Sequence, residues 1–182
     1  MKFKISLKDE NEFEQLVKEL SESEFRSSAD ELTGAVTKEA GERLHAKIVG
    51  NFQNGRPDWP ALSQVTAELK GHAQPLVDSG MLLRNITLTF VGETALVGIP
   101  DGAQYPDGTE VDLVASVMED GAVIRVTERM RNFFAARGFP LRKETEVIMI
   151  PARPFFEPAV KELEDELPEI LEEVFEKGKL LK

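Results

Sequence analysis

The chain has 182 residues, enough for one domain with a substantial core, and its 41% hydrophobic and 30% charged residues are typical of a globular protein. A net charge of -11 argues against a general nucleic-acid or anionic-membrane binder, and the absence of cysteine excludes a disulfide framework and a thiolate zinc site. The first residues lack an apolar segment of the signal-peptide type, and no apolar run approaches the roughly 20 residues of a membrane helix.

The N-terminal residues alternate between apolar and polar from Phe3 to Leu7, which predicts a half-buried strand. The lysines on its polar side indicate a strand at a sheet edge. An acidic run that begins at Asp9 is a helix start signal, because acidic side chains favour the first turn of a helix. The apolar residues of that predicted helix share one face: Phe13, Leu16, Val17 and Leu20.

The longest predicted element is a helix over residues 21–52. Ser21 and Glu24 have the spacing of a capping box. Apolar residues then recur every three or four positions, which predicts one buried face: Phe25, Ala29, Leu32, Val36, Ala40, Leu44, Ile48 and Phe52. Gly34 and Gly41 lie inside this helix, where each costs about 1 kcal/mol relative to alanine. We therefore expect a close helix contact or a slight bend at these glycines.

Turn residues dominate residues 50–60 and end the long helix. Ser63 is a predicted N-cap of a short helix, and Asp78 or Ser79 caps another short turn. Beyond them, two strands flank Gly92-Glu93, a two-residue loop with glycine first, which predicts a hairpin with a type II′ turn.

The second half of the chain is predicted to alternate helices and strands. Residues 111–120 have the pattern of a short helix ended by Gly121, with a strand as the alternative. Strands are predicted over residues 122–126 and 144–150. A helix of residues 127–138, capped by its first residue, lies between them.

The last predicted helix begins at Glu157, with Pro158 in the first turn where proline is tolerated. Pro168 is expected to kink or split this helix, and Gly178 to end it. Its apolar face is Val160, Leu163, Leu167, Ile170, Leu171 and Val174.

Charge is distributed unevenly in this half. Residues 121–143 hold six basic residues and one acid, whereas residues 157–177 hold nine acids and two lysines. Such runs are usually solvated faces, and they could also pair with each other within one chain. A third interpretation is that they form complementary surfaces on neighbouring subunits, as in a head-to-tail ring.

The stretch "IMIPARPFFEPAV" connects the last strand to the last helix. Its prolines make a stiff, extended connector. Arg153 lies between two prolines and can present its planar guanidinium to a carboxylate. Phe155 and Phe156 must enter a core or an interface, so the segment has the character of an assembly element more than of a reaction centre.

The sequence offers little for catalysis or metal binding. The two histidines, His45 and His72, have no companions at ligand spacing, so no metal or cofactor site is expected. Asp58, Glu68 and Lys70 fit the loose pattern of a metal-dependent nuclease, which requires the glutamate and lysine on a strand. Because the segment around them has a helical pattern, the nuclease interpretation is the weaker alternative.

The segments "FQNGRPDWPALSQVTAELK" and "PLVDSGMLLRNI" resemble the phage virion morphogenesis family, the Mu-like tail completion proteins. Three later segments, "ASVMEDGAVIRV", "RMRNFFAARG" and "IMIPARPFFEPAV", resemble this family as well and occur in the same order. The chain departs from the family pattern at Asp120, where an aromatic residue is usual. The residues of the first two segments that carry the resemblance are Pro57, Trp59, Leu62, Ser63, Thr66, Lys70, Leu76, Asp78, Ser79, Gly80 and Leu82.

The resemblance implies an α+β fold: a small, mostly antiparallel sheet with the long helix packed across it and an acidic C-terminal helix. It implies a non-enzymatic phage or prophage structural protein for virion morphogenesis, acting in tail completion or head–tail joining as an oligomeric ring. The expected partners are further copies of the chain and phage neck, connector and tail proteins, with no membrane or specific nucleic acid. The expected location is the virion, after assembly in the bacterial cytoplasm.

The expected organisation is one domain of residues 1–182, divided into an N-terminal strand and helix (1–20), the long helix (21–52), a core with the sheet (53–156) and the acidic helix (157–182). The candidate subunit contacts are Arg125, Arg129, Arg131, Arg153, Phe155 and Phe156. The expected structural residues are Trp59, Leu62, Thr66, Asp78, Gly80 and Gly121. A host interaction module of the same fold is the alternative outside the phage family.

Overall fold

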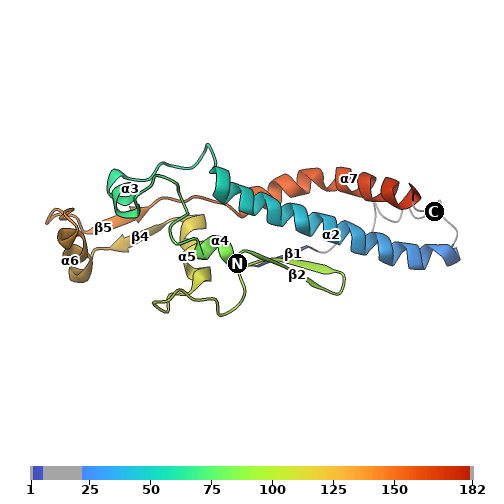
Figure 1. Ribbon diagram of the computed structural model, residues 1–182, viewed down its shortest axis with the longest axis horizontal. Helices are drawn as coiled ribbons and strands as arrows, with labels where there is room; N and C mark the ends of the chain where they lie inside the picture. Colours follow the sequence, from blue (N-terminus) through green and yellow to red (C-terminus); the bar gives the residue numbers. More distant parts are fainter. Residues whose placement is uncertain (1, 6–21, 181–182) are drawn as a thin grey trace. The chain divides into compact units, whose positions relative to one another are not determined.

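The computed structural model of the protein describes residues 2–5 and 22–180 (Figure 1). The helix predicted to begin at Asp9 lies outside the described residues. Ser21, the predicted first residue of the capping box, lies outside them as well. The chain divides into two compact units. Unit 1 comprises Val49–Asn85 and Asp101–Phe156, and unit 2 comprises the described parts of 2–48, Ile86–Pro100 and 157–182. The single domain predicted from length stays a prediction.

Unit 2 contains a three-stranded antiparallel sheet in the order β1-β3-β2. Its strands are β1 (Lys2–Ile5), β2 (Thr87–Val91) and β3 (Thr94–Gly98). The predicted N-terminal strand therefore exists and lies at a sheet edge, as its lysines indicated.

The hairpin between β2 and β3 has the predicted two-residue loop, since Val91 is paired with Thr94. Gly92 has a positive φ of +58°, whereas the φ of Glu93 is not positive. A type I′ turn needs positive φ at both central residues, whereas a type II′ turn needs it only at the first. The predicted type II′ turn is thus confirmed.

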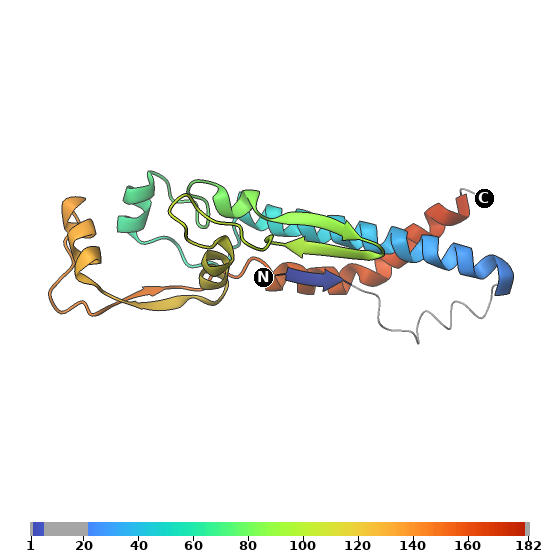
Figure 2. The ribbon, with the colours of Figure 1, turned by 90° about the horizontal axis from the view of Figure 1, so that it is seen from below.

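The long helix α2 (Glu22–Asn54) packs across this sheet, and Figure 2 shows the hairpin running along it. In unit 2 the predicted apolar stripe is buried at Val36, Ala40, Leu44 and Ile48 and half-buried at Leu32. Gly41 marks a close approach of the helix to β3: a Cβ added there would lie 2.7 Å from Ala95 Cβ. The glycine thus permits the helix to lie directly on β3.

The acidic helix α7 (Glu157–Leu180) begins at the predicted residue. It is continuous through Pro168, so the helix is not split there, and the alternative of a kink stays a prediction. It runs two residues beyond Gly178, the predicted end. Its inner carboxylates pair with α2: Glu166 Oε1 lies 2.7 Å from Lys47 Nζ, and Glu173 Oε2 lies 2.6 Å from an Arg43 guanidinium nitrogen. One side of α7 therefore faces the interior of unit 2: it carries these two carboxylates and the buried Leu163, Ile170 and Val174.

Unit 1 contains the end of α2 and the remaining elements: α3 (Gln64–Lys70), α4 (Met81–Arg84), α5 (Val111–Asp120), β4 (Ala122–Arg125), α6 (Glu128–Ala136) and β5 (Val147–Ile150). All of them follow the predicted order, and residues 111–120 form the helix rather than the alternative strand. Strands β4 and β5 pair as an antiparallel two-stranded ribbon, with Val123 opposite Met149. The α+β class predicted for the chain is therefore confirmed.

Two helix starts in unit 1 show the predicted caps. Ser63 is extended and its hydroxyl accepts a hydrogen bond from the Thr66 amide, and Thr127 does the same for Met130. Each cap satisfies an amide that the first turn of a helix leaves unpaired. The short α3 also ends as expected, with Gly71 in the left-handed region.

We predict opposite effects for alanine at the two glycines of α2. Gly41→Ala should lower the free energy of unfolding by about 1–3 kcal/mol, because its Cβ overlaps Ala95 and crowds Leu88. Gly34→Ala is the matched control, since a Cβ there meets nothing within 4 Å. It should raise stability by roughly 0.5–1 kcal/mol through helix propensity. Thermal unfolding followed by circular dichroism measures both, and equal shifts would contradict the close packing of α2 on β3.

Candidate assembly site

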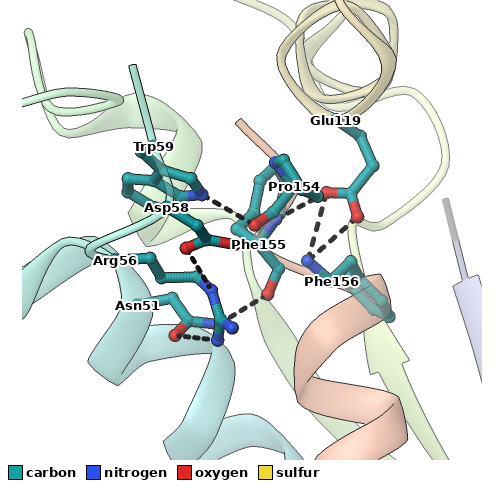
Figure 3. Close-up of polar contacts among 8 residues, drawn as sticks. All are labelled: Asn51, Arg56, Asp58, Trp59, Glu119, Pro154, Phe155 and Phe156. Carbon is teal, nitrogen blue, oxygen red and sulfur yellow. Dashed lines mark hydrogen bonds and ion pairs between the residues drawn. The ribbon is translucent and has the colours of Figure 1, made fainter. Parts of the chain in front are cut away.

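A buried glutamate in unit 1 holds the connector that precedes α7. Glu119 lies on α5, four and eight residues after the buried Ala115 and Val111, and the residue is 5% exposed. One carboxylate oxygen, Oε2, accepts hydrogen bonds from the amides of Phe155 (2.9 Å) and Phe156 (3.1 Å) (Figure 3). The other oxygen lies 3.2 Å from the Phe156 amide. Amide donors stabilise a buried carboxylate, which would otherwise be costly to desolvate.

The carbonyl groups of the same connector are bound from the other side. Trp59 Nε1 donates to the Pro154 carbonyl at 2.9 Å, and Asn51 Nδ2 donates to the Phe155 carbonyl at 2.8 Å (Figure 3). Trp59 is 8% exposed, so the structural role predicted for it fits its position. Three separate parts of the sequence therefore bind one short segment.

Arg153 is buried and not on the surface, with 5% of the residue exposed. Its guanidinium donates to the carbonyls of Pro60 (2.9 Å) and Ala61 (3.2 Å), not to the carboxylate that we expected. Burial lowers the pKa of Arg153 from its usual value. An arginine nevertheless remains charged at neutral pH, so these are charge-assisted hydrogen bonds.

The two phenylalanines of the connector form an aromatic core with the end of α2. The Phe52 and Phe155 ring centroids are 4.8 Å apart at 63°, and those of Phe155 and Phe156 are 6.1 Å apart at 69°. Phe155 and Phe156 are 0% and 1% exposed. The expectation that Arg153, Phe155 and Phe156 contact another subunit is therefore corrected: all three side chains lie inside unit 1.

Gly121 occupies a position that only glycine suits. Its φ of +75° with ψ of 172° lies in a region other residues avoid. An added Cβ would also meet the Ala152 amide nitrogen and the Ile150 carbonyl oxygen at 2.8 Å. The turn predicted here joins α5 to β4 directly beside the connector.

The remaining expected structural residues surround α3 and α4. Thr66 takes part in the Ser63 cap, and Gly80, with φ +74°, immediately precedes α4. Leu62 is half-buried and Asp78 is exposed. Asp78 raises the pKa of Lys70, yet burial, the larger effect, lowers it overall.

The pattern suggestive of a nuclease does not have the required local structure. Glu68 and Lys70 lie on helix α3 rather than on a strand, and the Glu68 carboxylate accepts from Gln64 four residues earlier. Asp58 pairs with Arg56 at 3.3 Å. Over residues 2–5 and 22–180, no group of three or more acidic, histidine or cysteine side chains could hold a metal ion.

The three arginines expected at a subunit contact have different roles. Arg131 on α6 donates to the carbonyls of Arg142, Lys143 and Thr145, so it holds the loop that precedes β5. That role is structural, and the expected subunit contact of the half-exposed Arg131 stays a prediction. Arg125 on β4 and Arg129 on α6 are exposed, so their expected role at an interface stays a prediction.

Two features of the site were missed in the sequence. Glu119 could have been found, because its spacing from Val111 and Ala115 places it on the buried face of the predicted helix. The second feature is the exposure of apolar residues on the β4–β5 ribbon, where Val123 and Met149 are 65% and 74% exposed. Strand periodicity alone does not say that this face of the ribbon lacks a covering layer.

No family model, curated protein or solved structure matches the chain. In the part of the chain that the structure describes, no helix is both long enough and apolar enough to cross a membrane.

We predict that Glu119→Leu loosens the connector. It leaves the buried amides of Phe155 and Phe156 without this acceptor, at about 1–3 kcal/mol per amide. Glu119→Gln keeps one acceptor oxygen and should cost less. The single tryptophan, Trp59, is bound to the same connector, so its fluorescence emission should shift to the red along with a lower melting temperature.

The matched control for this change is Asp120→Leu, which alters the exposed neighbour of Glu119 in the same turn of α5. Surface substitutions usually change stability by about 0.5 kcal/mol or less. If the two leucine variants melted at the same temperature with the same fluorescence, the carboxylate would not be the anchor described above.

For the loop before β5, we predict that Arg131→Ala speeds hydrogen exchange of the Thr145 amide, which donates to the Arg142 carbonyl. The change removes the guanidinium that holds three carbonyls of this loop. Arg129→Ala, two residues earlier on α6, should leave the exchange rate unchanged. Hydrogen exchange read by mass spectrometry separates the two, and identical behaviour would reject the assigned role of Arg131.

Proposed function

We propose that the chain is a non-enzymatic structural protein of phage virion morphogenesis that acts in tail completion or head–tail joining as an oligomeric ring. One observation carries the proposal. The segments that resemble the phage family lie far apart in the sequence, yet Trp59 contacts Pro154, Arg153 contacts Pro60, and Glu119 contacts Phe155. The segments that carry the resemblance thus build one hydrogen-bonded cluster, and this common structural role supports the proposal.

The chemistry of this cluster also suits a structural role. Its two ionisable side chains, Glu119 and Arg153, are buried and bind backbone amides and carbonyls. A catalytic group must reach a substrate, whereas groups engaged in this way position the chain. The proposed protein thus works through its surfaces, with further copies of itself and with phage neck, connector and tail proteins as partners, in the virion after assembly in the bacterial cytoplasm.

A phage from which this gene has been deleted tests the proposal directly. We expect electron microscopy of the induced lysate to show full heads and separate tails, because the two halves form but do not join. Supplying the wild-type gene from a plasmid should restore infectious particles, and supplying Asp120→Leu, the variant with an exposed change, should do so as well.

Normal infectious particles from the deletion would reject the proposed role. The same exposed surfaces would then serve a host interaction module, and purified virions would lack the protein by mass spectrometry. Metal-dependent cleavage of DNA by the purified chain, lost in Glu68→Ala and Lys70→Ala, would instead favour the nuclease.

A further inference from the structure

Residues 122–150 form an arm that consists of β4, α6, the loop after it, and β5 (Figure 1). The register places Val123 opposite Met149 and Arg125 opposite Val147, and because residues two apart on a strand share a face, all four lie on one side. Val123, Val147 and Met149 are 65%, 45% and 74% exposed. A two-stranded ribbon is marginally stable alone, and an exposed apolar face commonly marks a binding surface.

The arm is also a cationic surface. Arg125 lies on the apolar face just described, and Arg129 is exposed on α6. Among the described residues of unit 1, neither arginine makes an ion pair. A partner for this face must therefore be acidic and must also offer some apolar surface.

The outer side of α7 has both properties. Three exposed acids lie away from the carboxylates that pair with α2: Glu164, Asp165 and Glu172. Within the described part of unit 2, none of these three makes an ion pair. The half-buried Leu167 and Leu171 flank them and supply apolar surface.

Pro168 adds a specific feature to this side of α7. It lies inside the helix and is exposed. Proline has no amide hydrogen, so the carbonyl of Glu164, four residues earlier, lacks its usual helical donor. An arginine has five donors and can bind a carboxylate and a carbonyl together. The acids and the free carbonyl thus fit an arginine-bearing surface.

We propose that the arm of one chain docks on the outer, acidic side of α7 of a second copy. Arg125 and Arg129 bind Asp165, Glu172 and the Glu164 carbonyl, while Val123 and Met149 lie against the aliphatic flank. The contact joins two different surfaces, so each copy uses its arm on one neighbour and its α7 on another. Such a heterologous contact generates a ring when it closes.

The α7 helix of a second copy fits the arm better than a second arm or a nucleic acid would. Two arms facing each other would bring like charges together, which is unfavourable. Nucleic acid would have to approach a chain whose net charge is -11. The contact deepens the proposed function and relies on it for a biological role, but the purified chain alone is enough to measure it.

The test uses two reversed-charge variants of the full chain. The arm variant carries Arg125→Glu and Arg129→Glu, and the helix variant carries Asp165→Lys and Glu172→Lys. Arg131 is left unchanged because it holds the loop before β5. Light scattering after size-exclusion chromatography should show that each variant self-associates about tenfold more weakly than wild type, since each faces like charge.

Mixing the two variants in equal amounts gives the decisive result. The acidic arm of one then meets the basic α7 of the other, and the basic arm meets the acidic α7, so association should return in alternating oligomers. Wild-type assembly should weaken between about 0.05 M and about 0.5 M salt, because screening acts on the charged part of the contact. Val123→Ser with Met149→Ser should weaken it at both salt concentrations.

A control variant makes the same change in net charge as the arm variant, but at two other residues of the arm. Arg142→Glu with Lys143→Glu makes the same net change in the loop of the arm, away from the ribbon face, and should assemble as wild type does. Circular dichroism confirms that every variant is folded.

Three results would overturn the proposal: a wild-type monomer at low salt, no recovery on mixing, or equal loss in the loop control. Nucleic acid that copurifies with wild type and is lost from the arm variant alone would do so as well. A phage that is normal without the gene, with recovery on mixing intact, would reject the proposed function and leave this contact standing.

Discussion

The structure of unit 1 depends on a pairing between one carboxylate and two backbone amides. Prolines prevent residues 151–156 from joining a helix or sheet, so the remaining amides need other partners. The amide of Arg153 donates to the Met118 carbonyl at 2.7 Å, and those of Phe155 and Phe156 donate to Glu119. The last turn of α5 thus serves every amide from residue 153 to 156. Without Glu119, the buried amides of Phe155 and Phe156 would lack this acceptor, at about 1–3 kcal/mol per amide.

The same requirement explains why a charged arginine lies in the interior. The extended segment after Trp59 presents the carbonyls of Pro60 and Ala61, and it too belongs to no helix or sheet. A planar guanidinium can donate to both carbonyls at once, which a lysine cannot do with the same geometry. Glu119 and Arg153 therefore have complementary tasks: one satisfies amides of the connector, and the other satisfies carbonyls of the segment that packs against it.

Local patterns in the sequence were enough to predict the elements, but not this arrangement. The caps at Ser63 and Thr127 depend on residues three positions away, and the type II′ turn depends on two adjacent residues, so each could be predicted. Arg153 and its acceptors are more than 90 residues apart, and spacing carries no information about such a contact. The end of α7 was placed too early because glycine disfavours a helix by only about 1 kcal/mol, which packing elsewhere along the helix can offset.

The anchor and the arm divide stability and binding between different residues. Gly121 precedes β4, and the backbone that follows β5 passes directly beside this glycine, so the ribbon starts and finishes at the anchored connector. The buried hydrogen bonds fix the base of the arm, whereas Val123, Met149 and Arg125 make no contribution to that base. Their exposure costs the fold little, and substitutions on this face can therefore alter association without unfolding the chain. An exposed apolar face on this arm therefore fits a binding surface for a partner.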